Sequence, residues 1–394
     1  MTCQFLKHTN YMFLCILSLC VFQVFFQIPA AGGQDTLNKW KRHAIADLPD
    51  RAIFIQGADV DSDGHPDLIA GGWWWKNPGT LAGKWKQSTI GEPLHNMAVV
   101  YDFDKDGDPD ILGTEGVGAA KNTNFVWARN DGKGRFTINK NVNYTGGGDF
   151  LQGCTAACMN NTIRVALSWH RDGGGIYTLN VPNNPVSDTW TTTLLSKTVS
   201  SPPQGEDLDF GDIDRDGDLD LLLGDLWLRN DGDIWPTFRL GKITNGEPDR
   251  VDLADINGDG RLDAVVALEK GTDIWWFEAP ADPTDTWKQH RLGVIAGQGF
   301  SMDTEDFDGD GDPDVVLGEH RGKIENRVVL FRNTGAGSFW TQYIVDKDSK
   351  DVIDHHDGTV AADMDSDGDL DIISIGWYNP KVWLYENLQD HSDK

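Results

Sequence analysis

The stretch "ADMDSDGDLDIISIGWYNPKVWLYENL", residues 362 to 388, decides the fold of this chain. It places five aspartates in nine positions and follows them at once with an apolar segment. The aspartates have the pattern Asp-x-Asp-x-Asp-Gly-x-x-Asp, in which alternate carboxylates and a central glycine suit a tight loop around a cation. The apolar run that follows is typical of a buried β-strand.

The same pattern, with Asp or Asn at its third position, occurs six times in the 394 residues, each time before an apolar strand. The copies start 43 to 57 residues apart, except for one interval of 110 residues that leaves room for two units. A seventh unit without the motif is therefore expected near Ala157, where "NNTIRVALSW" supplies the strand. The six copies start at Asp59, Asp102, Asp212, Asp255, Asp306 and Asp363.

Two further series of strands also number seven. One opens on an aromatic residue, from "WKRHAI" at Trp40 to "FWTQYI" at Phe339, and the other is Trp-rich, from "WWWKN" to "VWLYEN". The first aromatic strand precedes the first aspartate loop, whereas the last unit ends after its third strand. We therefore predict an all-β, seven-bladed β-propeller over residues 38–389, closed by the N-terminal strand, with residues 390–394 as a tail.

These repeats resemble a known family, the FG-GAP or VCBS repeat propellers, of which the integrin alpha head is a seven-bladed member. The resemblance covers nearly the whole chain after its N-terminal segment. It departs from the family pattern in the third blade, which has lost its loop. The strands after the loops also end in "AGG", "LGT" or "SIG" rather than "GAP". Integrin-type partner binding is therefore not implied.

The loops have the chemistry of calcium sites. Carboxylates at positions 1, 3, 5 and 9, a glycine at position 6 and a backbone carbonyl at position 7 supply hard oxygen ligands. An EF-hand would need a glutamate at position 12, which none of the six loops has. Solvated turns are the alternative, but so many aspartates would repel one another without a cation.

We expect about six structural Ca²⁺ sites, and the fourth, with Asn257 at position 3, should bind most weakly. The resemblance implies that the ligands are Asp59, Asp61, Asp63 and Asp67; Asp102, Asp104, Asp106 and Asp110; Asp212, Asp214, Asp216 and Asp220; Asp255, Asn257, Asp259 and Asp263; Asp306, Asp308, Asp310 and Asp314; and Asp363, Asp365, Asp367 and Asp371.

The net charge indicates which partners are excluded, and the N-terminal segment indicates the cellular location. The net charge of −28 and the lack of a basic block argue against nucleic acid as a partner. An apolar run from Tyr11 to Ile28, followed by small residues, predicts a signal peptide over residues 1–32. An uncleaved N-terminal anchor is the alternative, and no other membrane contact is expected. The protein is thus expected to be secreted or on the cell surface, either extracellular or periplasmic.

Cys154 and Cys158 are the two cysteines that follow this segment. In an extended strand they would lie about 13 Å apart, beyond the roughly 7 Å that a disulfide allows. Both are therefore expected to be buried free thiols.

A ligand site is expected on the face opposite the loops, at the mouth of the central channel. Connections between blades, and between second and third strands, meet there and carry aromatic and charged residues. The alternative is that these connections are polar only because they are exposed. The candidates are Arg51, His95, Asn96, Glu206, Arg250, His355, His356, Trp169, His170, His320, Trp377 and Tyr378.

Two classes of function fit this face. The first is a calcium-stabilised binding module for a glycan or an extracellular protein. The second is a sugar-active enzyme of the polysaccharide lyase or sugar dehydratase type, in which an arginine neutralises a carboxylate and a histidine moves a proton. His95, His356 and Arg51 are the catalytic candidates, because the two histidines precede Asp102 and Asp363 by seven residues each. The outer loops around His170 and His320 are the alternative site, and the sequence does not indicate the oligomeric state.

Overall fold

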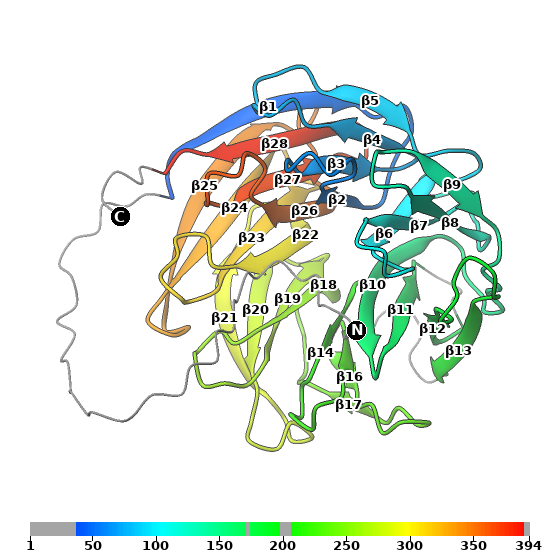
Figure 1. The fold of residues 1–394 in the computed structure, drawn as a ribbon. Helices are drawn as coiled ribbons and strands as arrows, with labels where there is room; N and C mark the ends of the chain where they lie inside the picture. The colour runs from blue at the N-terminus through cyan, green and yellow to red at the C-terminus, as the bar shows by residue number, and fades with distance from the viewer. Residues whose placement is uncertain (1–36, 171–173, 198–205, 390–394) are drawn as a thin grey trace, which may run out of the picture.

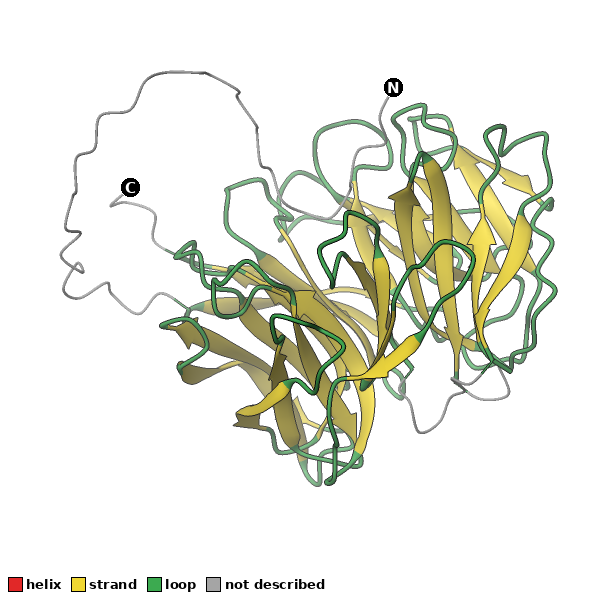
Figure 2. Cartoon of the chain, turned by 90° about the horizontal axis from the view of Figure 1, so that it is seen from below, coloured by secondary structure: helices red, strands yellow, loops and turns green. Residues whose placement is uncertain are grey.

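The computed structural model of the protein describes residues 37–170, 174–197 and 206–389. These residues form 28 β-strands in seven four-stranded antiparallel sheets arranged around a centre, as Figures 1 and 2 show. The predicted all-β, seven-bladed propeller is confirmed. The signal-peptide or anchor segment and the tail after Gln389 lie outside the described residues. No helix in the described part is long and apolar enough to cross a membrane.

Each of the first six blades takes its strands from consecutive stretches of chain. Blade 1 contains β2 (Ile55–Ala58), β3 (Asp67–Ala70), β4 (Trp73–Lys76) and β5 (Lys86–Thr89). Blade 2 contains β6 (Asn96–Tyr101), β7 (Asp110–Thr114), β8 (Phe125–Asn130) and β9 (Phe136–Asn139). Blade 3 contains β10 (Leu151–Met159), β11 (Thr162–Trp169), β12 (Ile176–Asn180) and β13 (Thr191–Ser196). Blade 4 contains β14 (Leu208–Gly211), β15 (Asp220–Leu223), β16 (Leu226–Leu228) and β17 (Thr237–Arg239). Blade 5 contains β18 (Glu247–Ala254), β19 (Asp263–Glu269), β20 (Asp273–Glu278) and β21 (Lys288–Val294). Blade 6 contains β22 (Gln298–Glu305), β23 (Asp314–His320), β24 (Glu325–Thr334) and β25 (Phe339–Ser349).

The seventh blade joins the two ends of the described chain. Its strands are β26 (Asp357–Ala362), β27 (Asp371–Ile375), β28 (Lys381–Asn387) and β1 (Trp40–Asp47). The pairing of β1 with β28 is antiparallel and runs from Trp40 opposite Asn387 to Asp47 opposite Lys381. Figure 1 shows these two strands side by side, blue against red. The first strands of neighbouring blades also contact one another all the way around, from β2 through β26 and back to β2.

The third blade has a short hairpin where the other blades have an aspartate loop. Asn160 and Asn161 connect β10 to β11 with φ angles of 48° and 66°. Two left-handed residues form the type of two-residue turn that suits the twist of a hairpin, and asparagine tolerates this conformation well. The predicted seventh unit without the motif is therefore confirmed.

Asparagine side chains at the ends of third strands link blades to their neighbours. Asn77 donates from Nδ2 to the Met364 carbonyl oxygen at 2.8 Å, across 287 residues of sequence. This oxygen belongs to the aspartate loop of the preceding blade. The same bond joins Asn130 to the Val60 carbonyl oxygen and Asn333 to the Ile256 carbonyl oxygen. The register between blades is thus fixed by directional bonds as well as by packing.

The hydrophobic core consists of clusters between the faces of adjoining blades. Trp74 and Trp75 point to opposite sides of β4 and pack in different clusters, which is the packing between blades that the alternation of a strand predicts. Trp127 and Trp227 are completely buried. Large rings therefore fill the widening gaps between the sheets.

The two cysteines of blade 3 differ from each other. Cys154 is a free thiol, and burial raises its pKa. Cys158 is disulfide-bonded. The expectation of two free thiols is correct for Cys154 and wrong for Cys158.

Removing β1 should destabilise the ring. A chain that begins at Leu48 lacks β1 and exposes the edge of β28, whereas a chain that begins at Leu37 keeps both. We expect the shorter chain to aggregate or to melt roughly 5 °C or more below the longer one, because an edge strand loses its partner. Calorimetry and size-exclusion chromatography would measure this, and equal melting temperatures would contradict the role assigned to β1.

Candidate functional site

The first carboxylate of each aspartate loop organises the loop backbone. In blade 1, Asp59 accepts the N–H groups of Asp63 at 3.0 Å and of Gly64 at 2.9 Å. Gly64 has a φ of +90°, which glycine adopts without a steric penalty. The chain therefore turns around the carboxylates, and the glycine of the motif is required by the turn.

The ninth carboxylate anchors the loop to the blade. Asp67 is fully buried and accepts N–H bonds from Val60 at 3.1 Å and from Asn77, just after β4, at 2.7 Å. Burial raises the pKa of Asp67 to about 7 and that of Asp110, its counterpart in blade 2, to about 8. These carboxyl groups are thus costly to ionise unless a cation lies beside them.

In five of the loops, carboxylate oxygens from positions 1, 3 and 9 lie within 4.8 Å of one another. The five groups are Asp59, Asp61 and Asp67; Asp102, Asp104 and Asp110; Asp212, Asp214 and Asp220; Asp306, Asp308 and Asp314; and Asp363, Asp365 and Asp371. The remaining loop, the fourth along the chain, has Asn257 at position 3 and is not among them. Five loops could therefore hold a metal ion.

These donors fit a hard divalent cation. The Oδ1 atoms of Asp61, Asp104 and Asp365, all at position 3, are buried and make no hydrogen bond to the described residues. An unpaired buried carboxylate oxygen is unfavourable, and a cation bound by the three carboxylates would compensate it. The carboxylates at position 5 are not part of these groups; Asp63 and Asp106 pair with Lys76 and Arg129, which also pair with Asp61 and Asp104 at position 3.

The opposite face, which carries the connections between blades, contains a buried histidine and carboxylate pair. His320, at the end of β23, is hydrogen-bonded through Nδ1 to Asp354, and both side chains are 1% exposed. The other carboxylate oxygen of Asp354 accepts the N–H groups of Trp377, at 3.0 Å, and of Tyr378. Burial alone would raise the pKa of Asp354, but these bonds, led by the one to His320, hold it below its usual value. Asp354 therefore stays ionised.

His320 is correspondingly a neutral base near pH 7. Burial lowers its pKa more than the bond to Asp354 raises it. With the Nδ1 proton held by Asp354, the lone pair is on Nε2, which is buried and makes no hydrogen bond to the described residues. Burial also lowers the pKa of His355 to about 4, and this fully buried side chain is hydrogen-bonded to Ser374 at 2.8 Å.

Aromatic rings pack against His320 and against His356, which precedes β26. Tyr378 stacks on His320 with ring centroids 5.2 Å apart, and Trp377 stacks on His356 at 4.8 Å. Phe300 of β22 lies against both imidazoles, at 5.0 and 4.7 Å. We define the histidine cluster as the set of His320, Asp354, His356, Phe300, Trp377 and Tyr378. It lies between blades 6 and 7.

Cations lie around the histidine cluster. The guanidinium of Arg51, from the connection into blade 1, lies 5.0 Å from the centre of the Trp377 ring and 5.9 Å from that of Tyr378. Arg321 lies 4.6 Å from the Phe300 ring and pairs with Glu269 at 2.6 Å. Five residues expected at one mouth therefore come together here: Arg51, His320, His356, Trp377 and Tyr378.

Other candidates lie elsewhere on this face. His95 pairs with the exposed Glu92 at 3.0 Å, and no ring contact joins it to the histidine cluster among the described residues. His170 of blade 3 is bound to Asp149 at 2.9 Å and lies 4.0 Å from Glu206. The structure thus separates His95 and His170 from His356.

Three candidates are enclosed by the protein itself. Trp169 is 1% exposed and donates its indole N–H to the Tyr144 hydroxyl at 2.9 Å, so its ring is part of the core rather than a ligand platform. Arg250 is buried and donates to the carbonyl oxygens of Phe300 and Gln152. Buried Asn96, whose Oδ1 accepts the Ile53 N–H at 3.4 Å, also has a structural partner.

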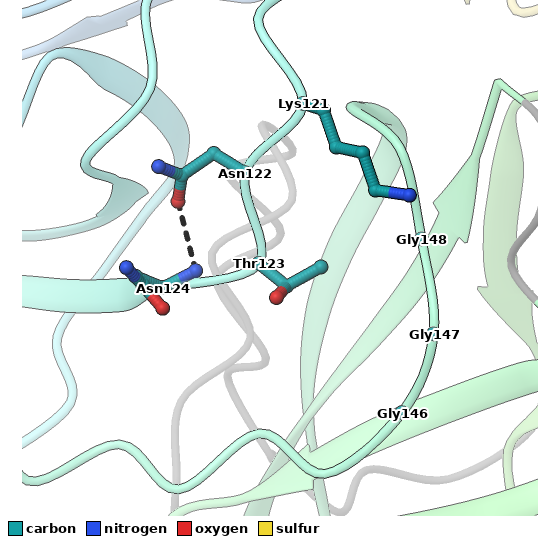
Figure 3. Close-up of a pocket in the computed structure, with 7 residues that line it drawn as sticks. All are labelled: Lys121, Asn122, Thr123, Asn124, Gly146, Gly147 and Gly148. Carbon is teal, nitrogen blue, oxygen red and sulfur yellow. Dashed lines mark hydrogen bonds between the residues drawn. The ribbon is translucent and has the colours of Figure 1, made fainter.

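Two hollows open on the connection face. One, of about 460 Å³, adjoins the histidine cluster and is lined by His320, Arg321, Gly322, Asn326, Lys350, Asp351, Tyr378 and Asn379. The other, of about 480 Å³, lies between blades 2 and 3 and is lined by Lys121–Asn124 and Gly146–Gly148. Figure 3 shows Lys121 and Thr123 pointing towards the glycine segment. Packing requires glycine at two of these positions, since a Cβ at Gly146 would lie 2.3 Å from the Tyr144 hydroxyl and one at Gly148 would lie 2.3 Å from the Trp169 ring.

Sequence reasoning missed some residues of the histidine cluster and its hollow. Phe300 and Lys350 belong to no motif and come from opposite ends of blade 6. The one signal was the position of Phe300 on a first strand, just before "SMD" and the next aspartate loop. Contacts between connections of different blades require the closed ring, which no local pattern encodes.

Comparison with known proteins supports the fold. The FG-GAP-like repeat family model matches residues 59–113, 255–317 and 306–374. The chain is a seven-bladed β-propeller, and the matched stretches, which lie in blades 1, 2, 5, 6 and 7, are similar to FG-GAP-like repeats. No curated protein matches it.

Among solved structures, a chain in the crystal structure of S. cerevisiae core factor matches with a TM-score of 0.51 and 9% identity, over 92% of this chain. This chain covers 63% of the yeast one. At such low identity, the likeness concerns the fold alone.

The pH dependence of stability should report on the ninth carboxylates. In calcium-free protein their raised pKa means that the folded state binds more protons than the unfolded chain between about pH 4 and pH 8. Stability should therefore fall as the pH rises through this window, giving a lower melting temperature at pH 8 than at pH 5. Millimolar calcium should remove or reverse the difference. A calcium-free melting temperature that rises from pH 5 to pH 8 would contradict the assignment.

Proposed function

We propose that this protein is an exported, calcium-stabilised binding module that recognises an acidic glycan at the histidine cluster. Three features support the proposal: the aspartate loops, an N-terminal segment of signal-peptide type, and a hollow with the mixed aromatic and cationic lining that a charged sugar requires. Calcium gives the ring rigidity, while the connections on the opposite face provide the ligand site.

The observation that carries the proposal is the local reversal of charge and polarity at this hollow. The protein has a net charge of −28, yet Arg321 and Lys350 line this hollow, with Asp351 the acidic residue in the lining, and Arg51 lies 5.9 Å from the ring of Tyr378, which also lines it. Tyr378 is 62% exposed. An aromatic ring beside guanidinium and ammonium groups suits a sugar ring that carries carboxylate or sulfate groups.

Calcium supports this site indirectly. The aspartate loops join the first and second strands of a blade, and the lining residues sit on connections at the other ends of the same sheets. The loop of blade 6 precedes β23, which ends in His320. Each bound ion is expected to contribute on the order of 1 to 2 kcal/mol at millimolar calcium.

A sugar-active lyase is the second candidate, and the pair of His320 and Asp354 favours it. An ionised Asp354 orients the imidazole and leaves Nε2 as a base, the arrangement that proton abstraction requires. Tyr378 covers His320 and would have to move for a substrate to reach Nε2. The binding module needs no such movement and is therefore the first choice.

Binding to acidic polysaccharides would test the proposal. Uronate-containing and sulfated polysaccharides, with neutral ones for comparison, would be screened by affinity electrophoresis. We expect Tyr378→Ala and Arg51→Ala each to weaken retention at least tenfold, about 1.4 kcal/mol, because they remove the stacking face and a cation. Absorbance of unsaturated products in the same samples would reveal a lyase, and His320→Gln should abolish that turnover.

Phe339→Ala is the matched control, because Phe339 is an aromatic residue with 72% exposure on β25, away from the hollow. It should leave retention unchanged. Asp106→Asn should lower the melting temperature in calcium and affect retention by the polysaccharide less. If the Tyr378→Ala and Arg51→Ala variants are retained as strongly as the parent protein, the ligand site lies elsewhere. If no polysaccharide retains the parent protein and it binds only a protein ligand, the glycan assignment is overturned.

A further inference from the structure

One position at the end of the third strand adjoins the aspartate loop in all six blades that have one. The residue that follows this position donates its backbone N–H to the ninth carboxylate of the loop. In blade 1 that residue is Asn77, which bonds to Asp67, so the position is that of Lys76. This bond measures 2.7 to 2.9 Å in all six loops, so the position is structurally equivalent in the six blades. Its occupants are Lys76, Arg129, Arg229, Glu278, Arg332 and Glu386.

In four blades this residue is a cation that pairs with loop carboxylates. Lys76 contacts Asp61 and, at 2.6 Å, Asp63. Arg129 lies 2.5 Å from Asp104. The other two cations are Arg332, which contacts Asp308 and Asp310, and Arg229, which lies 4.0 Å from Asp214 and 2.7 Å from Asp231.

In blade 7 the same position is Glu386, and its carboxylate faces the outer strand. Oε2 of Glu386 lies 2.7 Å from Lys41 and 2.7 Å from His43, both on β1. In the described part of the chain, no lysine or arginine pairs with Asp363 or Asp365, and Glu386 adds to the negative potential at Asp365.

This difference matters for a divalent cation. In blades 1, 2 and 6, an incoming ion must share the carboxylates at positions 3 and 5 with an ammonium or guanidinium group, or displace that group from its ion pairs. Either course costs affinity, because like charges a few ångströms apart repel and broken pairs must be replaced. The loop of blade 7 has no such competitor.

We propose that this third-strand position sets how tightly each loop holds its cation, and that the loop Asp363–Asp371 of blade 7 is the tightest site. The inference rests on the calcium binding proposed above. It places the strongest site in the blade that β1 completes, next to the residue that holds Lys41 and His43. Cation binding and the attachment of the first strand therefore share one sheet.

Blade 5 provides an internal control. Glu278 occupies the equivalent position and pairs with Lys288 at 3.0 Å and His290 at 2.8 Å, as Glu386 does with Lys41 and His43. Its loop, however, has Asn257 at position 3, and Arg261 pairs with Asp259. A change at Glu278 thus disturbs the same kind of ion pairs without affecting a strong site.

Calorimetric titration of the full chain with calcium, with chelator competition for the tight class, tests the inference. In the parent protein we expect one site to bind at least tenfold more tightly than the others. Glu386→Arg should remove this class by weakening it at least tenfold. Arg332→Glu, which leaves blade 7 intact, should create a second tight site in blade 6, and Glu278→Arg should leave the tight class unchanged.

The outcomes are distinct. Sites of a single affinity in the parent protein would overturn the inference while leaving calcium binding intact. A tight class that survives Glu386→Arg would do the same. If Glu386→Arg fails to fold, Arg332→Glu decides alone, and its failure to add a tight site overturns the inference. No calcium binding at all would overturn both this inference and the calcium-stabilised module.

Discussion

The buried ninth carboxylate of each aspartate loop is the interaction on which the structure depends. In blade 7, Asp371 accepts N–H bonds from Met364 at 3.0 Å and from Asn387 at 2.9 Å, and so ties the loop and the third strand to the start of the second strand. The Met364 carbonyl oxygen then accepts Asn77 of the next blade. One carboxylate thus connects the turn of its loop, the strands of its own blade and the neighbouring blade. Because burial opposes its ionisation, the same group favours a cation beside it.

This constraint assigns different chemistry to the two faces. The loops concentrate carboxylates where first strands turn into second strands, so that face is suited to cations. On the other face, connections carry no repeated motif and can vary without disturbing the fold. Between blades 6 and 7 they form the histidine cluster, in which a fully bonded Asp354 holds His320. A regular ring can therefore carry a cluster between two of its blades that the repeat does not encode.

Similar residues acquired different roles according to their depth in the fold. Trp169 ends a second strand and Trp377 follows one, yet Trp169 is enclosed by Tyr144 and Phe125 while Trp377 stacks on His356 near the surface. Arg250 and Arg51 both lie near the starts of blades. Arg250 bonds backbone carbonyl oxygens of two other blades, whereas Arg51 stays exposed over aromatic rings. Residue type and order along the chain could not distinguish these cases.

The number of blades, the position of each aspartate loop and the blade that lacks one could all be predicted from the amino-acid sequence. These features depend on residues close together in the chain: alternating carboxylates, a glycine that permits the turn, and an apolar strand directly afterwards. Three features are visible only in the folded ring: which connections meet, which aromatic residues are buried, and where the third-strand charges point. Lys76 pairs with its own loop, whereas Glu386 pairs with β1. These outcomes depend on distances between strands and blades far apart in sequence, which exist only when the ring has closed.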